Sequence, residues 1–259
     1  MLIEFAEENW KPFASISFAN EAEAYTQDKN GAYICTLDGL SLENVQYIKL
    51  MFTGRDDGRN WVVLNEVILH ENGAVGIDTS WMMRKEPLST HPWIASAQVI
   101  GSWNRDREKE LSWSRYKTYD QDLTTFWNPE AQPGYTGQPG IVFTLKGQMA
   151  LNKLQLHFYK DIYYFDVYVS KDGASYTQIA DISYANEGEA YAAGADDTYV
   201  CTLEGMQLKG VQYIKLVFDG RKTQNAWVSL KEIVVSEDGK TGIDTSWMMR
   251  TKPASKHPV

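Results

Sequence analysis

Residues 151–170 read LNKLQLHFYKDIYYFDVYVS and contain two short stretches in which apolar residues alternate with polar ones. In the first, Leu154, Leu156 and Phe158 fall on one face of an extended chain. The second, YFDVYVS (164–170), has the same period. A period of two is typical of a β-strand with one buried face. We therefore predict two neighbouring strands here.

Similar stretches occur before and after these two and are rich in β-branched and aromatic residues: IVFTL (141–145), TYVCTL (198–203), VQYIKLVF (211–218) and WVSLKEIVV (227–235). Turn signals such as SKDGAS and SEDGKTG separate them, and no long stretch has a helical period. Short strands separated by glycine-containing turns are typical of β-sandwiches and barrels. We predict an all-β fold, an antiparallel β-sandwich.

The sequence repeats itself with a period of 166 residues. The nonapeptide GIDTSWMMR occurs at 76–84 and again at 242–250. Residues 47–92 align with 213–258 without a gap, and 26 of these 46 positions are identical. Self-similarity at a fixed period indicates a repeated structural unit.

This period divides the chain into a partial and a complete copy. Residues 94–259 are a complete copy with a tail over 240–259, whereas 1–93 lack a counterpart of roughly 94–168. We interpret the chain as a slice of a longer multi-module protein. Half a sandwich leaves strand edges and one face exposed. We therefore expect 1–93 to pack on the second copy or to be completed by another chain.

The two cysteines, Cys35 and Cys201, occupy equivalent positions in the two copies. They are therefore expected in different domains, where they cannot pair with each other. We predict a buried free thiol in each core, since unpaired cysteine behaves as a small apolar residue.

The composition limits the classes of partner. Net charge is −9, from 25 basic and 34 acidic residues, which argues against binding to nucleic acid. No apolar run approaches the ~20 residues of a membrane span, so we expect no membrane insertion. The acidic start MLIEFAEENW lacks the features of a signal peptide, so any secretion signal is expected outside this chain.

The stretch KTYDQDLTTFW (117–127) resembles a motif of the discoidin family, the coagulation factor 5/8 type C domains, and in particular of the bacterial family 32 carbohydrate-binding modules. That motif is an Asp-rich loop ending in Thr-aromatic-Trp. The segment YFDVYVSKDGASYTQIAD and the stretches VQYIKLVF and WVSLKEIVV resemble later landmarks of the family, in the same order. The resemblance implies a galactose-binding-like jelly roll.

The resemblance also implies one structural calcium ion. Its expected ligands are the carbonyls of Lys117, Asp122 and Lys231, the side chains of Asp120 and Glu232, and the oxygens of Thr125. Calcium takes six to eight hard oxygens at about 2.3–2.6 Å, and this loop can supply several. The alternative is that these Asp and Thr residues only form turns. Asp120-Gln121 stands where the family has Asp-Gly, which loses the residue best suited to positive φ.

Sugar recognition needs a flat aromatic face and polar groups directed at hydroxyls, and the resemblance places ligands at loops at one end of the sandwich. The candidates are Trp103, Arg105, Trp113, Tyr163, Tyr164, Arg221 and Asn225. Trp113 could instead belong to the core, and one of the two tyrosines should point inward. Arg221 recurs as Arg55, which also fits a structural role in its turn.

We predict a non-catalytic carbohydrate-binding module that belongs to a larger secreted or surface glycan-active bacterial protein and binds galactose- or N-acetylhexosamine-type ends. Extracellular or cell-surface placement follows from the resemblance. No histidine spacing, G-x-S-x-G motif or phosphate loop indicates catalysis. A structural or protein-adhesion repeat is the alternative, and a lipid-binding discoidin domain is disfavoured by the acidic charge. Trp247 and the methionines beside it are too apolar to stay in water, so we expect the tail to dock on the sandwich or on a neighbouring module.

Overall fold

The structure is a computed structural model that describes residues 10–55, 61–71, 76–101, 113–129, 138–223, 228–237 and 242–254. Its contacts divide the chain into two units, Met1–Leu88 and Ser89–Val259. The helices of the described residues have four residues each, so none of them is long enough to cross a membrane.

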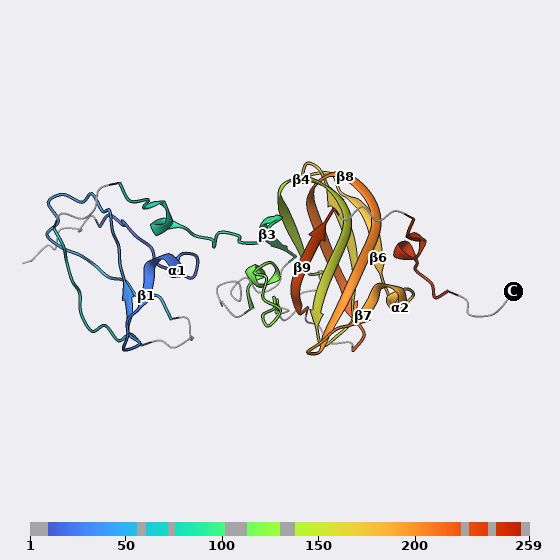
Figure 1. Cartoon of the computed structure of the whole chain (residues 1–259), viewed down its shortest axis with the longest axis horizontal. Coiled ribbons are helices and arrows are strands. Elements are labelled where there is room, and N and C mark those ends of the chain that lie inside the picture. Colours follow the sequence, from blue (N-terminus) through green and yellow to red (C-terminus); the bar gives the residue numbers. More distant parts are fainter. Residues whose placement is uncertain are drawn as a thin grey trace, which may run out of the picture. The chain divides into compact units, whose positions relative to one another are not determined.

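The second unit is built from antiparallel strands (Figure 1). These strands are β3 (Ile94–Ile100), β4 (Gly140–Tyr159), β5 (Tyr163–Ser170), β6 (Thr177–Ile182), β7 (Tyr191–Ala193), β8 (Thr198–Arg221) and β9 (Leu230–Ser236). Short helices accompany them: η4 (Arg115–Thr118), α2 (Glu187–Ala190) and η5 (Ser246–Met249).

Two long strands, β4 and β8, take part in both layers of the sandwich. In one layer, the first part of β4 lies between β3 and the last part of β8, which continues to β5 and β6. In the other, the second part of β4 lies between β9 and the first part of β8, which continues to β7. Register shifts between Thr144 and Lys153 mark the bend of β4, since bulges let a strand turn a corner without losing its partner.

The prediction of an antiparallel β-sandwich is confirmed. The predicted strands differ from the observed ones in one respect. Residues 141–145 and 151–159 are predicted as separate strands, but both belong to the single strand β4. The same is true of 198–203 and 211–218 within β8.

The core lies between the two layers and is made by the alternating apolar residues. Leu154, Phe158 and Phe165 are completely buried, and Phe218 is 2% exposed. The ring of Phe158 lies 5.6 Å from that of Phe165 and 6.2 Å from that of Phe218, measured between centroids. A slip of one residue would turn these side chains to the solvent face, so the core fixes the strand register.

One end of the sandwich, here called the loop end, collects residues 113–129, 159–163, 194–198, 221–223 and 228–230. Strands β4 and β8 end there, and β5, β8 and β9 begin there. Backbone hydrogen bonds tie the loops together: Trp127 N donates to Leu230 O at 2.8 Å, and Lys160 N donates to Asp197 O at 2.7 Å. Side chains from segments distant in sequence therefore meet at the loop end.

The tail docks on its own unit through a contact that we call the tail clamp, made by residues 181–190 and 246–250. Asn186 is completely buried, and its amide donates to Asp181 O at 2.6 Å and Trp247 O at 3.0 Å. Met248 is 2% exposed. The tail is therefore held both through the backbone carbonyl of Trp247 and through the apolar side chain of Met248.

The first unit contains α1 (Glu21–Ala24), β1 (Tyr25–Gln27), β2 (Tyr33–Cys35) and η1 (Ser80–Met83). Each has an equivalent 166 positions later, and Tyr25 faces Cys35 as Tyr191 faces Cys201. The tail clamp is present too, because Asn20 donates to Trp81 O at 2.7 Å. The two copies thus share their local structure in this part.

The cysteines differ between the units, and neither is in a disulfide. Cys201 is completely buried, as predicted, and burial raises the pKa of its thiol. The prediction for Cys35 is wrong, because this residue is exposed. Strand β2 pairs only with β1 in the described residues, whereas its equivalent in β8 also pairs with β4.

Candidate functional site

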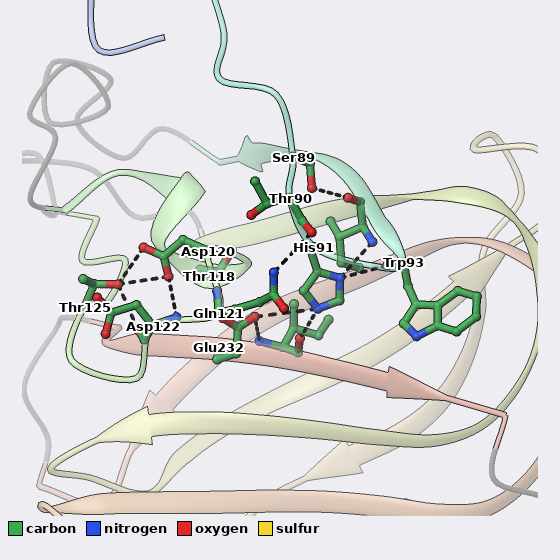
Figure 2. A network of polar contacts seen from close by, with 12 residues as sticks. Ser89, Thr90, His91, Trp93, Thr118, Asp120, Gln121, Asp122, Thr125 and Glu232 are labelled. Carbon is green, nitrogen blue, oxygen red and sulfur yellow. Dashed lines mark hydrogen bonds and ion pairs between the residues drawn. The ribbon is translucent and has the colours of Figure 1, made fainter. Parts of the chain in front are cut away.

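The acidic loop of residues 117–125 begins in the last residues of η4 and brings several oxygens together (Figure 2). The Thr125 hydroxyl lies 2.9 Å from Asp120 Oδ2 and 3.1 Å from the carbonyl oxygen of Asp122. Asp122 also accepts the backbone N–H and the hydroxyl of Thr124, at 2.9 and 2.7 Å. These hydrogen bonds lower the pKa of Asp122, which stays ionised.

Gln121 connects this loop to β9. Its backbone has φ 63°, a left-handed conformation that glycine adopts most easily. Its N–H donates to Glu232 Oε2 at 2.7 Å, and its side-chain amide donates to Thr90 O at 3.2 Å. The unusual backbone at Gln121 is therefore held by contacts on both sides, as Figure 2 shows.

Glu232 is a buried carboxyl group, 4% exposed, in the middle of β9. Burial raises its pKa to about 8, although the N–H groups of Gln121 and Ile233 act in the opposite direction. His91 lies on its other side, with Nε2 3.9 Å from Glu232 Oε1. Burial also lowers the pKa of His91, so its ring is no strong cation for Glu232.

These groups can be tested for calcium. Asp120, Thr125 and the Asp122 carbonyl form an all-oxygen set, which is what calcium prefers. Glu232 is a buried acid whose charge a nearby cation would stabilise. Lys117 Nζ, 3.2 Å from Asp120 Oδ2, now supplies positive charge at the loop. The described residues contain no group of three or more His, Cys, Asp or Glu side chains suited to a metal, so an ion here would depend on carbonyl and hydroxyl oxygens. The set fits calcium on those terms.

A row of three aromatic rings lies at the loop end. Trp113 meets Phe126 edge to face, with centroids 4.9 Å apart, and Phe126 stacks on Tyr159 at 5.0 Å. All three residues are half-buried. The ammonium groups of Lys160 and Lys231 lie over the Tyr159 ring, at 4.9 and 5.2 Å from its centroid. The row is thus a largely apolar surface bordered by positive charge.

A buried ion pair lies on the adjoining loop. Arg221 Nε is 3.2 Å from Asp161 Oδ2, and both side chains are about nine-tenths buried. Thr223 donates its hydroxyl proton to the same carboxylate. Arg221 also donates to the Tyr163 hydroxyl at 3.3 Å. This arrangement fixes a guanidinium group at the end of β8.

The side-chain oxygen of Asn128 is buried at the loop end and has no hydrogen-bond partner in the described part of the chain. The amide nitrogen of the same side chain donates a hydrogen bond to Ser229 Oγ at 3.0 Å. Buried polar groups are normally hydrogen-bonded, so the Asn128 oxygen can accept a further hydrogen bond.

A family model of the F5/8 type C domain matches residues 98–233. The chain belongs to the F5/8 type C domain family. The matched residues include the acidic loop, the aromatic row, the Arg221–Asp161 pair and Glu232. The resemblance on 117–127 therefore identified the family correctly.

No curated protein matches the chain. Among solved structures, a pectin-binding carbohydrate-binding module is similar, with 17% identity and a TM-score of 0.41 over 57% of this chain and 94% of that chain. A module from Clostridium perfringens in complex with GalNAc-β-1,3-galactose has 19% identity and a TM-score of 0.40 over 54% and 93%. A chitosan-binding module from Paenibacillus sp. IK-5 has 16% identity and a TM-score of 0.39 over 54% and 93%.

The F5/8 type C domain places the candidate sugar residues in different environments. Tyr163 is 1% exposed and lies in the core, so its ring offers no surface to a ligand. Tyr164 is half-buried and donates its hydroxyl proton to Glu187 at 2.7 Å. Burial and this carboxylate raise the pKa of Tyr164. Of the two tyrosines, one does point inward, as the sequence analysis expected.

The remaining candidates divide into two groups. Trp113 and Arg221 lie at the loop end, in the aromatic row and in the buried ion pair. Trp103, Arg105 and Asn225 lie outside the described residues. Of the calcium candidates, Asp120, Asp122 and Thr125 are joined by hydrogen bonds within the loop, and Gln121 joins this loop to Glu232. The amino group of Lys231 donates to Thr198 Oγ1 at 2.7 Å, and the role expected for its carbonyl stays a prediction.

Several residues of this F5/8 type C domain were not found by sequence reasoning: Phe126, Tyr159, Asp161, Thr223, Asn128 and His91. Phe126 lies within the quoted motif 117–127, so it carried a signal that was available. Asp161 follows the strand end HFYK, and nothing local indicates that it pairs with Arg221, 60 residues later. Such a pair is visible only in the fold.

The outer face of the five-stranded layer carries a shallow groove in addition. Its lining includes Gln98, Thr144, Tyr176, Tyr213 and Lys215. The ammonium of Lys215 lies over the rings of Tyr168 and Tyr176, at 4.4 and 4.2 Å from their centroids. These rings are therefore already engaged by a cation from the same sheet.

Proposed function

We propose that this chain is a non-catalytic carbohydrate-binding module whose glycan site lies at the loop end of the F5/8 type C sandwich. The observation that carries the proposal is the row Trp113–Phe126–Tyr159, which shares the loop end with the Arg221–Asp161 pair. Sugar binding needs an aromatic surface for the C–H face of the ring and fixed polar groups for the hydroxyls. The unpartnered oxygen of Asn128 adds an acceptor.

The proposed ligand is a galactose- or N-acetylhexosamine-type end. Galactose-type sugars present a continuous C–H face, which suits an aromatic surface, and hydroxyls that a guanidinium and an amide can bind. We also propose, on the family resemblance, that the chain works within a larger secreted or cell-surface protein acting on glycans. The net charge of the chain is −9, which disfavours polyanionic ligands because they need a strongly basic surface.

A glycan array with the full chain tests the proposal. We expect selective binding to the named ends, weakened about tenfold (~1.4 kcal/mol) in Trp113→Leu and partly retained in Trp113→Phe, because an aromatic ring is kept. Arg221→Gln should weaken binding, and the matched variant Arg55→Gln should not, because no such aromatic row occurs among the described residues of the first unit. Thermal melts must confirm that each variant folds. A blank array with folded protein contradicts the proposal, and Trp103→Ala extends the test to the candidate residues outside the described ranges.

We also propose a structural calcium ion at the acidic loop, held by Asp120, Thr125 and the Asp122 carbonyl, with Glu232 on β9; the Lys117 and Lys231 carbonyls are further candidates. Its support is the short oxygen–oxygen spacing at Thr125 and the burial of Glu232. Lys117 would have to move away from Asp120 when the ion binds, because both need the same oxygen.

Calcium removal should lower the melting temperature of the second unit. An ion at 100 times its Kd contributes about 2.7 kcal/mol, which is a shift of roughly 5–10 °C for a unit of this size. Asp120→Ala should reproduce the shift and abolish the response to a chelator. Glu66→Gln is the matched control, since Glu66 corresponds to Glu232 but no acidic loop precedes it in the sequence. An unchanged melting temperature after chelation would contradict the calcium proposal.

A structural or protein-adhesion role is the second candidate. It is favoured by the tail clamp, since the residues repeated most faithfully in the two copies bind to their own unit. A folded protein that binds no glycan but captures a protein partner in a manner sensitive to loop-end variants would support this second function.

A further inference from the structure

The first unit exposes a large set of apolar side chains. Ile48 is 42% exposed, Leu50 50% and Phe52 56%. Further large apolar residues of the same unit have at least 45% exposure: Tyr33, Val45, Tyr47, Met51, Trp61, Val62, Val63, Leu64, Val67, Ile68 and Leu69. Folded proteins rarely expose so many large apolar side chains without a partner.

The second unit shows what these residues do when they are covered. Ile214, Leu216 and Phe218 stand 166 positions after Ile48, Leu50 and Phe52, and they are 0%, 0% and 2% exposed. Leu230, the equivalent of Leu64, is completely buried as well. Equivalent residues of one repeat thus lie in a core in one unit and on the surface in the other.

The cover in the second unit comes from its front half. Ile214 is paired with Phe143 of β4 and Val169 of β5, and Phe218 is paired with Phe165. Leu230 is paired with Phe158. Phe143, Phe158 and Phe165 lie in the half of the repeat that has no counterpart in the first unit, and Val169 aligns with Ile3 in the sequence.

The backbone of the first unit also lacks the strand pairing that its equivalent has in the second unit. Among the described residues, 45–55 and 61–70 belong to no strand, whereas the equivalent residues include the last part of β8 and all of β9. In the second unit β4 and β5 supply the hydrogen-bond partners of these strands. Unpaired strand edges are templates for another strand.

We propose that the apolar face of the first unit receives the front half of a further repeat of this kind, with the strand pattern of residues 94–166. The interface would continue the one that β4 and β5 make with β8 and β9 in the second unit. Residues 94–166 of this chain are already used there, so the segment is an additional copy. The proposal does not depend on glycan binding.

The segment is proposed to lie directly ahead of the first unit in the same polypeptide. In the second unit only residues 171–176 separate β5 from β6, so the front and back halves are joined by a tight hairpin. Residues 5–10 align with that hairpin. A covalent connection of this length also makes pairing intramolecular, which raises the effective concentration of the strand.

A fusion protein tests this inference. A second copy of residues 94–166 is placed directly before Met1, which restores the period of 166 because Met1 aligns with Val167. The added segment contains no cysteine, so Cys35 and Cys201 remain the only thiols. Their reaction with Ellman's reagent is followed under native conditions in the 259-residue chain and in the fusion protein.

We expect Cys35 to react rapidly in the 259-residue chain and about 100-fold more slowly in the fusion protein, because a thiol in a folded core reacts only after local opening. Cys201 is the internal control and should react slowly in both. A second fusion protein with Phe143→Asp and Leu156→Asp in the added copy alone should leave Cys35 reactive. It separates specific pairing from general crowding by an extra segment.

Three results would overturn the inference. Cys35 could react equally fast with and without the intact added segment while Cys201 stays protected. The segment with two aspartates could protect Cys35 as well as the intact one. Cys35 could already be protected in the 259-residue chain as a dimer in sedimentation, in which case a second copy is the occupant of the face.

Discussion

At the scale of single residues, the outer face of the five-stranded layer places two carboxylates opposite each other. Asp166 of β5 is paired with Asp181 of β6, and Asp219 lies nearby on β8. Burial and the Asp166 charge raise the pKa of Asp181. The negative charge of Asp166 is better stabilised, since this carboxylate accepts hydrogen bonds from Gln178 at 2.7 Å and Tyr168 at 3.1 Å. Asp181 is therefore the member whose charge costs stability.

We predict that Asp181→Asn stabilises the second unit at pH 7 by about 0.5 kcal/mol, the usual size for like charges across a strand pair that is partly in water. A raised folded pKa means that the acid favours folding when protonated and loses this contribution as pH rises through the folded pKa. The gain should thus disappear near pH 3. Urea unfolding at both pH values measures it.

Asp172→Asn is the contrasting variant for this test. Hydrogen bonds from the N–H groups of Ser175 and Ala174 lower the pKa of Asp172, so its charge favours the folded state at neutral pH. This variant should destabilise the protein at pH 7. The prediction for Asp181 is contradicted if both variants change the free energy of unfolding in the same direction.

At the scale of elements, the tail clamp shows how a short segment is held without a strand. η5 contacts β6, and Asn186 binds both the end of β6 and the tail through one amide. Arg250 forms an ion pair with Glu189 of α2. The same contacts recur at Asn20, Arg84 and Glu23. The nonapeptide GIDTSWMMR therefore contributes to the structure of each unit.

We predict that Met248→Ala lowers the free energy of unfolding of the second unit by about 2–4 kcal/mol, since it leaves a cavity. Met249→Ala should change it by less than about 0.5 kcal/mol, because Met249 is 48% exposed. Denaturant unfolding of the two variants decides between docking through the core-facing methionine and a loosely attached tail. Equal effects of the two would contradict the docked tail.

At the scale of the whole molecule, the chain carries nearly the same strand twice in different environments. Residues 45–52 and 211–218 differ only at Met51 and Val217. The second segment lies in the middle of β8, and the first belongs to no strand among the described residues. Tertiary surroundings, and not local sequence, account for the difference.

Hydrogen exchange measured by mass spectrometry should separate these two segments. Their intrinsic exchange rates are almost equal because their sequences are, and the Met–Val difference distinguishes the peptides by mass. We expect 211–218 to be protected at least about 1,000-fold more strongly than 45–52, as core strands open only with the whole unit. Similar protection of the two peptides would mean that the first unit is covered in the 259-residue chain.

The sequence predicted a good part of this protein and of its candidate site. The period-two stretches placed the core residues, because alternation alone decides which side chains can face a second layer. The sequence also showed that Gln121 stands where the family motif has glycine. The backbone at this position has φ 63°, the left-handed conformation that glycine adopts most easily. The motif 117–127 led to the correct family.

Other features were decided only by the tertiary structure. The sequence could not show that β4 and β8 are continuous, because a bulge that turns a strand between layers resembles a loop locally. It left open which of Tyr163 and Tyr164 points inward, and packing against Phe158 decided this. The Arg221–Asp161 pair and the burial of Glu232 join residues far apart in sequence. The sequence by itself determined the strands, the repeat and the family; contacts between distant segments determined which side chains meet, because burial and pairing depend on the whole fold.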